Sequence, residues 1–520
     1  MTETIKSNTK KPCLVQTAQG FSVSYDEKFL YSKYNPSKSI LGVIENLKLL
    51  PQTVILCVSP VLNYGLKELA QKLPEDCIMI GCELEDELYD FIQENKNNPL
   101  CDFSNIPDFS FLSKEELFNL GPNLIKKMPG IFRRIIRIDF SAAAQLHSDT
   151  YNKVIENVTN ALMTYWANRV TLVKFGRKYC TNFFKNLEVL PQTTPIQKYF
   201  GTIEKPILVF GAGESAAQGI EHIKKTSRND YYILCADTAL QPLITNGIVP
   251  DGVFIEEAQT VITKCFIGTQ KSDIHIFAGL SSLHSITRLF KTAQISFFMT
   301  EFTQATFIDR FEKAGILPPK NEPFGSVGIT TYYYAHIFRK DNSVPIYTYG
   351  LDFAYSAGRT HTKGAMADNA RFMTSSRLKT DANYGAAFNE PAFKKDEKMY
   401  TTPIMERYAQ LMKELVYERD CRVKPDNDTV EPVHVEGAFI KQYLQKERAS
   451  LLELKSLLTG EKQLPEAELQ KEITRLIQER EYLFLHFPDG HKFQYSQSFL
   501  NRVRVEIEYY LKIISYPLSL

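Results

Sequence analysis

Three clusters of small and polar residues in the middle of this 520-residue chain could do chemistry. The first is the turn Gly211-Ala212-Gly213-Glu214-Ser215, which follows the apolar run PILVF and opens a helix-like stretch. Glycines in such a turn let the backbone approach a ligand, and free N–H groups at a helix start attract phosphate. We therefore expect Gly211, Gly213 and Ser215 to bind a nucleotide, although a tight strand-to-helix turn needs glycine in any case.

Two further sites follow from strand and helix ends. Asp237 and Thr238 come directly after the run YYILCA, where an acid can hold a ribose hydroxyl. The turn GSVG precedes an apolar helix, so Ser326, Val327 and Gly328 could offer backbone N–H groups to a phosphate or carboxylate. An ordinary helix cap by Ser326 explains that turn equally well.

The densest polar cluster is the stretch 350–364, GLDFAYSAGRTHTKG, which follows the strand-like PIYTY. Open α/β sheets bind ligands at the carboxyl ends of their strands, so this stretch is expected at a ligand site. Asp352, Tyr355, Arg359 and His361 supply an acid, a phenol, a cation and an imidazole. We expect these four residues to be catalytic, with His361 as the base because its unperturbed pKa of about 6.5 suits proton transfer.

Two segments have the layout needed to position such residues. TVILCV (53–58) leads through a helix-like stretch to CIMIGC, which ends at Glu83; PILVF leads in the same way to YYILCA and Asp237. Strand–turn–helix–strand units with apolar, non-alternating strands are typical of parallel sheets buried on both faces. The sequence predicts an α/β fold with two tandem Rossmann-like parallel-sheet domains. The first unit has one glycine in its turn, so we expect a structural role there, with Glu83 a solvated loop acid.

The rest of the chain completes a three-part organisation. Residues 105–190 are expected to be mainly helical, and further strands are expected within 273–280, 295–299 and 344–353. Beyond about residue 395, apolar residues recur at helical spacing in two stretches, which predicts a C-terminal helical region that packs within the chain or in a homo-oligomer. The predicted domains are 1–190, 191–395 and 396–520.

Composition limits the class of protein. Sixty-one Lys and Arg against 60 Asp and Glu give a net charge of +1, which argues against nucleic acid as a partner. We expect no membrane span and no secretory signal, because the apolar runs are short and the start is polar. The nine cysteines form no CxxC pair, as expected of a cytoplasmic protein. We predict no metal site, because Glu256 and Glu257 are adjacent in a strand and point to opposite faces.

Four motifs, in order, resemble the central domain of the motility-associated factor (Maf) family: PILVFGAGES, CADTALQPLITNGIVPDGVFIE, GSVGITTYYYA and YTYGLDFAYSAGRTH. That family is identified with glycosyltransferases that modify flagellin with nonulosonic acids of the pseudaminic or legionaminic type. Its central domain is similar to bacterial sialyltransferases, which use CMP-activated sugars without a metal. It is also similar to an enzyme that diphosphorylates a hydroxymethylpterin. The resemblance covers roughly residues 200–390.

The resemblance implies roles for individual residues. The glycine turn 211–215, Asp237 and the turn 326–328 would hold CMP; Asp352 belongs to a strand-end Gly-x-Asp-Phe, and His361 is the counterpart of the catalytic histidine. Tyr355 and Arg359 would neutralise the leaving group. The chain departs from its relatives at Glu214-Ser215-Ala216, where Pro-Ser-Leu is usual, and at 256 or 257, where Glu replaces Asp.

We therefore expect a metal-independent glycosyltransferase that moves a nonulosonic acid from a CMP ester to Ser or Thr of flagellin, with no permanently bound cofactor. One alternative is an ATP-dependent pterin-type diphosphokinase, which would need Mg²⁺ on Glu256, Glu257 or Asp237. Another is a non-catalytic flagellin-binding or assembly protein, which the departures at Glu214 and Ala216 favour.

Overall fold

A computed structural model describes residues 11–269, 272–303, 305–421 and 436–514. The chain divides into two compact units, one of residues 1–173 and 487–492 and the other of residues 174–486 and 493–520. The boundary falls inside the long helix α6 (Ser148–Val189). The predicted three-domain division at residues 190 and 395 stays a prediction.

The first unit contains a four-stranded parallel sheet in the order β6-β5-β4-β7. β4 is buried along its whole length because helices cover both faces of the sheet. A small antiparallel sheet precedes it. The elements are β1 (Cys13–Thr17), β2 (Gly20–Tyr25), β3 (Lys28–Phe29), α1 (Lys38–Asn46), β4 (Thr53–Val58), α2 (Leu66–Ala70), β5 (Ile78–Cys82), α3 (Asp86–Glu94), β6 (Phe109–Leu112), α4 (Lys114–Phe118), α5 (Leu120–Lys127) and β7 (Arg134–Asp139).

One expectation for this unit is confirmed and another is wrong. The stretch 105–190 is mainly helical, as expected, because α4, α5 and α6 make up most of it, but it also contains β6 and β7, which extend the sheet. Glu83 is not solvated: it is 1% exposed at the carboxyl end of β5, and its Oε1 accepts a hydrogen bond of 2.9 Å from the Glu85 N–H. Burial raises the pKa of Glu83 to about 6.

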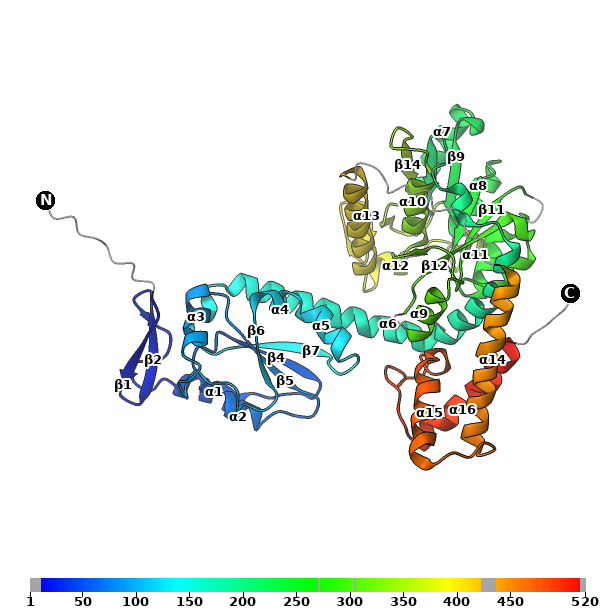
Figure 1. Ribbon diagram of the computed structural model, residues 1–520. Coiled ribbons are helices and arrows are strands. Elements are labelled where there is room, and N and C mark those ends of the chain that lie inside the picture. Colours follow the sequence, from blue (N-terminus) through cyan, green and yellow to red (C-terminus); the bar gives the residue numbers. More distant parts are fainter. Residues whose placement is uncertain (1–10, 270–271, 304, 422–435, 515–520) are drawn as a thin grey trace. The chain divides into compact units, whose positions relative to one another are not determined.

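The second unit is built on a seven-stranded parallel sheet in the order β13-β12-β11-β10-β9-β8-β14 (Figure 1). Its inner strands β8, β9 and β10 are apolar and almost wholly buried, as predicted for parallel strands. Its elements are β8 (Ile207–Phe210), α7 (Ala216–Lys225), β9 (Tyr232–Ala236), α8 (Leu240–Thr245), β10 (Gly252–Ile255), β11 (His275–Gly279), β12 (Ile295–Thr300), α9 (Thr306–Lys313), β13 (Lys320–Asn321), α10 (Val327–Phe338) and β14 (Ile346–Tyr349).

Helices pack on opposite faces of this sheet. The apolar face of α10 joins Ile207, Val209, Phe254 and Phe277 in one core. On the other face, α7 packs on Phe210 and Tyr349, whose rings stack with centroids 5.5 Å apart. A side chain at Gly219 of α7 would come within 2.7 Å of both rings, so this helix lies very close to the sheet.

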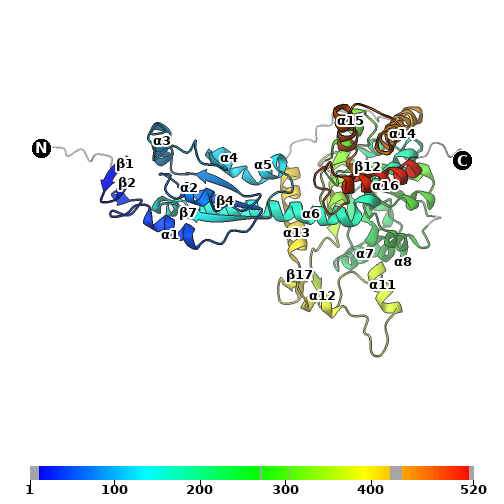
Figure 2. The same ribbon diagram turned by 90° about the horizontal axis from the view of Figure 1, so that it is seen from below.

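A lobe and the C-terminal helices complete the second unit. The lobe holds β15 (Tyr355–Ser356), α11 (Met366–Met373), α12 (Tyr384–Phe388), β16 (Phe393–Lys394) and β17 (Met399–Thr401), and it projects from the sheet in Figure 2. After it come α13 (Pro403–Cys421), α14 (Gly437–Thr459), α15 (Glu466–Gln478) and α16 (Gln497–Ile513). The two helices predicted from C-terminal periodicity correspond to α15 and α16.

A buried polar cluster joins the C-terminal helices to the sheet domain. Glu447 of α14 is 2% exposed and forms an ion pair of 3.1 Å with Arg310 of α9. The Tyr482 hydroxyl donates to the same carboxylate at 2.7 Å. Because a buried charge needs partners, these bonds hold α14 in place on α9.

The predicted α/β fold with two Rossmann-like parallel sheets and a C-terminal helical region is confirmed. Within the described ranges, no helix combines the length and apolar character that crossing a membrane requires.

Candidate functional site

The site lies at the carboxyl edge of the seven-stranded sheet. The strands from β9 to β13 are added one after another on one side of β8. The chain then returns, and β14 pairs with the other side of β8. Such a reversal is where open α/β sheets bind ligands. The turn after β8 and the loop after β14 therefore meet at this point.

The glycine turn is held by the β14 loop. The Gly213 N–H donates to the Gly350 carbonyl at 2.9 Å, and the Ser215 N–H donates to Asp352 Oδ2 at 2.9 Å. The Ser215 hydroxyl donates to the other carboxylate oxygen of Asp352. A carboxylate is favourable at this position because the N-terminus of α7 carries partial positive charge. Asp352 thus anchors the turn from within the chain.

This arrangement explains the glycines. A Cβ at Gly211 would lie 2.3 Å from the Gly350 carbonyl oxygen, and one at Gly213 would lie 2.4 Å from Asp352 Oδ2. Neither glycine has a positive φ. Both are needed for the close approach of the β14 loop. Among the described residues, the N–H groups of Ala212 and Glu214 have no acceptor, so these two could face a ligand.

Glu214 does not oppose an anion in the turn. Its carboxylate accepts a hydrogen bond of 2.7 Å from the Ser356 N–H in the lobe. Glu214 thereby joins the turn to the lobe.

Asp237 lies at the carboxyl end of β9 and is 3% exposed. Its Oδ1 accepts from the Thr238 N–H at 2.6 Å, and its Oδ2 has no partner among the residues that the structure describes. Burial raises the pKa of Asp237 to about 7, and the nearby carboxylates of Glu257 and Glu256 raise it further. Asp237 therefore has one buried carboxyl oxygen whose bonding capacity is unused among the described residues.

Glu256 connects the ends of three elements. Its carboxylate accepts from the Thr300 hydroxyl at the end of β12, at 2.5 Å, and from the Thr330 hydroxyl in the first turn of α10, at 2.8 Å. Burial raises the pKa of Glu256. In the described part of the chain, no group of three His, Cys, Asp or Glu side chains could hold a metal ion.

The start of α10 is close to the β14 loop. Ser326 is the N-cap residue of α10, but its side chain makes no capping bond. A Cβ at Gly328 would lie 2.4 Å from Leu351, the residue before Asp352. Ser326, Val327 and Gly328 thus lie at the edge that also carries the glycine turn.

His361 lies in a loop fastened to the glycine turn. The N–H of the next residue, Thr362, donates to the Ala212 carbonyl at 2.8 Å. His361 is partly buried, and its Nδ1 is 3.0 Å from the Thr360 hydroxyl. Burial lowers the pKa of His361, so its imidazole is neutral near pH 7. Neutral imidazole is the form that accepts a proton.

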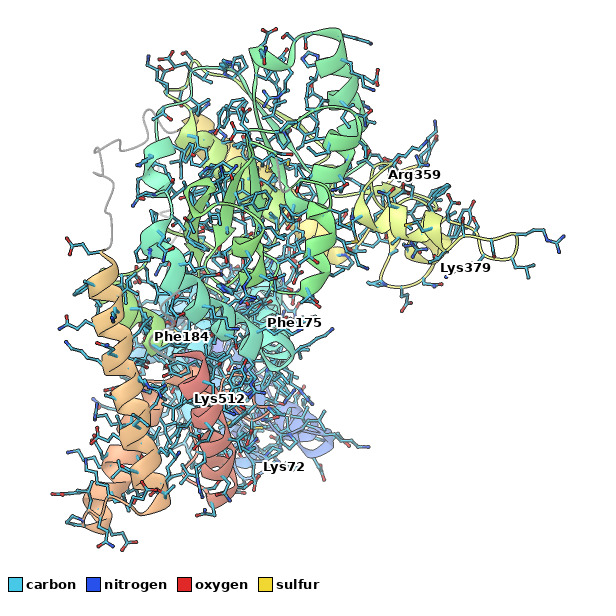
Figure 3. All side chains as sticks on the ribbon, turned by 90° about the vertical axis from the view of Figure 1, so that its right-hand side faces the viewer. Lys72, Phe175, Phe184, Arg359, Lys379 and Lys512 are labelled. Carbon is cyan, nitrogen blue, oxygen red and sulfur yellow. The ribbon has the colours of Figure 1, made fainter. Side chains whose placement is uncertain are left out.

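Two predicted catalytic residues have other surroundings. The Tyr355 side chain is buried, and its hydroxyl donates to the Ala386 carbonyl at 2.6 Å within the lobe. Burial raises the pKa of Tyr355. Arg359 is exposed on the lobe surface (Figure 3). The roles predicted for the twelve candidate residues remain predictions.

Sequence reasoning missed two asparagines on α6. The Asn186 amide donates to the carbonyls of Leu280 and Ser282 at 2.9 Å each, and its Oδ1 is 3.0 Å from His284 Nδ1. Asn182 donates to the Ser281 carbonyl at 3.3 Å. These side chains hold the loop after β11 at the carboxyl edge. No sequence pattern indicated them, because about 95 residues separate the partners.

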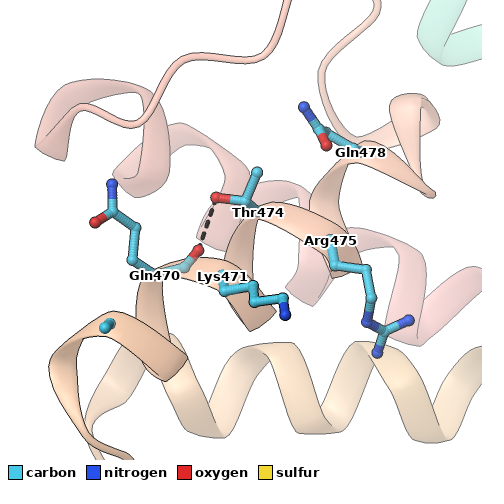
Figure 4. A pocket seen from close by; sticks show the side chains of 6 residues that line it. Gln470, Lys471, Thr474, Arg475 and Gln478 are labelled. Carbon is cyan, nitrogen blue, oxygen red and sulfur yellow. Dashed lines mark hydrogen bonds between the residues drawn. The ribbon is translucent and has the colours of Figure 1, made fainter.

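Two hollows lie away from this edge. One, of about 480 Å³, is lined by Gln470, Lys471, Thr474, Arg475 and neighbours on α15 (Figure 4). The other lies at the amino ends of the strands, around Arg228 and Asp251. Neither contains a predicted site residue.

Comparison with known proteins agrees with this architecture. The family described as 6-hydroxymethylpterin diphosphokinase MptE-like matches residues 181–358. An uncharacterized protein of Treponema pallidum (strain Nichols) is 29% identical over 555 residues, covering 97% of this chain and 95% of that protein. A Maf glycosyltransferase from Magnetospirillum magneticum AMB-1 has a similar structure, with a TM-score of 0.53 and 12% identity over 98% of this chain and 92% of that one. The predicted resemblance is confirmed.

Proposed function

We propose that this chain is a glycosyltransferase that moves a nonulosonic acid of the pseudaminic or legionaminic type from its CMP ester to Ser or Thr of flagellin. The observation that carries this proposal is the convergence of the glycine turn, the start of α10 and the His361 loop at one sheet edge. The likeness to a Maf glycosyltransferase over nearly the whole chain supports it.

Donor binding would use groups that still have bonding capacity. Asp237 Oδ2 would accept from a ribose hydroxyl, since it has no partner among the described residues. The phosphate of CMP would lie at the start of α10, near Ser326 and Gly328, and near the Ala212 and Glu214 N–H groups. Asp352 would act by positioning, since its carboxylate holds the turn through Ser215.

In the transfer step, the bond between the anomeric carbon and the phosphate oxygen breaks, and CMP leaves with the electron pair. The acceptor oxygen bonds to the anomeric carbon and gives its proton to His361. Thr360 would accept from His361 Nδ1–H, which leaves Nε2 to take the proton. Arg359, and the Tyr355 phenol after release from Ala386, would stabilise the departing phosphate. No metal or resident cofactor takes part in this scheme.

The same proposal places the protein in the cytoplasm, where CMP-sugars and unassembled flagellin would meet it, with no nucleic-acid partner. The amphipathic C-terminal helices would support a homo-oligomer.

A pterin-type diphosphokinase is the second candidate, because the MptE-like family matches residues 181–358. It would bind ATP with Mg²⁺ on carboxylates such as Asp237 and Glu256. EDTA separates the two: sugar transfer should continue in its presence, whereas diphosphoryl transfer should stop.

The test is the intact mass of flagellin from cells with and without the gene. A loss equal to whole nonulosonic acid residues supports the proposal, and unchanged mass with normal motility contradicts it. Thermal shift with CMP, UMP, ADP and ATP is a second test, in which an adenine preference would favour the diphosphokinase. If purified chain binds flagellin but transfers no sugar, the non-catalytic alternative holds.

A further inference from the structure

The lobe beside the site carries an unusual surface. All of residues 371–381 are exposed, and three apolar side chains there are almost bare: Phe372 is 69% exposed, Met373 84% and Leu378 92%. Single exposed apolar residues are common on proteins, but such a group on one projection is typical of an interaction surface. Figure 2 shows α11 and the following loop standing away from the sheet.

Hydrogen bonds and ring contacts order this surface. The Ser376 N–H donates to the Lys379 carbonyl at 2.8 Å, and the Lys379 N–H donates back at 3.1 Å. Leu378 therefore stands at the tip of a tight turn. Nearby, the rings of Tyr384 and Phe388 stack with centroids 6.4 Å apart, and both are more than half exposed.

The charges on this surface are mostly positive. Arg371, Arg377 and Lys379 lie among the exposed apolar residues, and Asp381 is the acid that follows them. None of the three cations forms an ion pair with another residue in the described ranges. Lys379 is labelled on the projecting lobe in Figure 3. Unpaired cations beside bare apolar groups suit a partner with carboxylates next to an apolar side chain.

The lobe is joined directly to the candidate site. Ser356, at its start, donates to the Glu214 carboxylate at 2.7 Å, and Thr362 donates to the Ala212 carbonyl at 2.8 Å. These bonds lie on the two sides of the stretch that ends at His361. A polypeptide on the lobe would therefore be bound to the part of the chain whose base is fastened to the glycine turn and contains His361.

We propose that this lobe surface docks the acceptor protein: Phe372, Met373 and Leu378 cover an apolar side chain of the acceptor, while Arg371, Arg377 and Lys379 pair with flanking carboxylates. This inference rests on the proposed function and adds to it the residues that select the acceptor. The surface acts in acceptor binding and leaves the donor side of the reaction untouched.

The experiment compares flagellin binding with CMP release by the full-length chain. The lobe variants are the double variant Arg377→Glu/Lys379→Glu and, separately, Leu378→Ser. Lys225→Glu on α7 and Val505→Ser on α16 are matched controls, because both residues are exposed and lie outside the lobe. The probes are flagellin purified without its sugars, and CMP-pseudaminic and CMP-legionaminic acid for release of CMP to water.

We expect the lobe variants to bind flagellin about tenfold more weakly or worse, with wild-type CMP release and wild-type circular dichroism. The controls should bind normally, and wild-type affinity should fall as salt screens the cations. Wild-type binding by both lobe variants overturns the inference, as does absence of binding by the wild-type chain.

Two other occupants of the surface would also overturn it. If Leu378→Ser turns a dimer into a monomer in light scattering, a second copy of the chain covers the lobe. If the wild-type chain binds vesicles of anionic phospholipid and the lobe variants do not, the lobe binds a membrane. The proposed function fails separately: no CMP release by the wild-type chain refutes transfer, while weakened flagellin binding by the lobe variants would still support docking.

Discussion

Asp352 is expected to stabilise the second unit, and Asp352→Ala tests this. The substitution removes two hydrogen bonds to an ionised acceptor, from the N–H and the hydroxyl of Ser215. Such bonds contribute about 1.5–3 kcal/mol each, and the anion at the start of α7 adds about 0.3–1 kcal/mol. Water reaches this partly exposed carboxylate and recovers part of the loss, so we expect a net cost of about 2–4 kcal/mol.

Asp352→Asn separates charge from hydrogen bonding. The amide keeps one acceptor oxygen and loses the charge, so we expect a cost of about 1–2 kcal/mol. Asp396→Ala is the matched control, since that carboxylate also accepts two backbone N–H groups, from Lys398 and Met399, but in an exposed turn. Its cost should be much smaller than that of Asp352→Ala, because water replaces the lost bonds of an exposed carboxylate.

Urea unfolding with two signals is the assay. Far-UV circular dichroism follows both units, whereas Trp166, the single tryptophan, reports on the first unit, where it donates to the Phe132 carbonyl at 2.8 Å. The tryptophan transition should stay in place while the other moves to lower urea. If Asp352→Ala leaves both transitions within about 0.5 kcal/mol of wild type, Asp352 does not anchor the turn.

Three further predictions concern the same edge. Gly213→Ala should cost about 2–4 kcal/mol and weaken CMP binding in calorimetry, because its Cβ would meet Asp352. Gly42→Ala is the contrast: this glycine lies inside α1 with open space around it, so the change should stabilise by about 0.5–1 kcal/mol. Asp237→Asn should stabilise the protein by up to about 4 kcal/mol at pH 8 and hardly at all at pH 4. The Asp237 carboxyl has a pKa of about 7 in the folded protein and 3.8 in the unfolded chain. The free energy of unfolding of the wild type therefore falls as the pH rises from about 4 to 7, whereas the amide does not ionise. Equal urea midpoints of both proteins at pH 8 would refute this. His361→Ala should slow sugar transfer about 10²–10⁴-fold and leave CMP affinity unchanged. The transfer rate of the wild type should rise with pH, with a midpoint below pH 6.5, and the variant should lose this dependence. Normal transfer by a folded variant would mean that another residue is the base.

Local features of the sequence were sufficient to predict the strands and turns of the second unit. β8, β9 and β10 are short apolar runs between turn residues, and such runs are recognisable because parallel strands are buried on both faces. The order of glycine turn, acid, small-residue turn and strand-end loop also places Gly211, Asp237, Ser326 and Asp352 at one edge, since parallel strands share the direction of their carboxyl ends.

The tertiary structure decided what each of these groups contacts. Ser215 and Asp352 are 137 residues apart, and only the pairing of β14 with β8 brings them together. Glu83 and Asp237 each follow a strand, and both are buried in the structure. Their position in the sequence does not reveal this, because burial depends on the segments that pack over them. β7 mixes polar and apolar residues, so its sequence indicates neither a buried strand nor a helix. Its pairing with β4 makes it a strand of the sheet. Spacing along the chain records local backbone preference, whereas burial and long-range partners depend on which strands lie side by side.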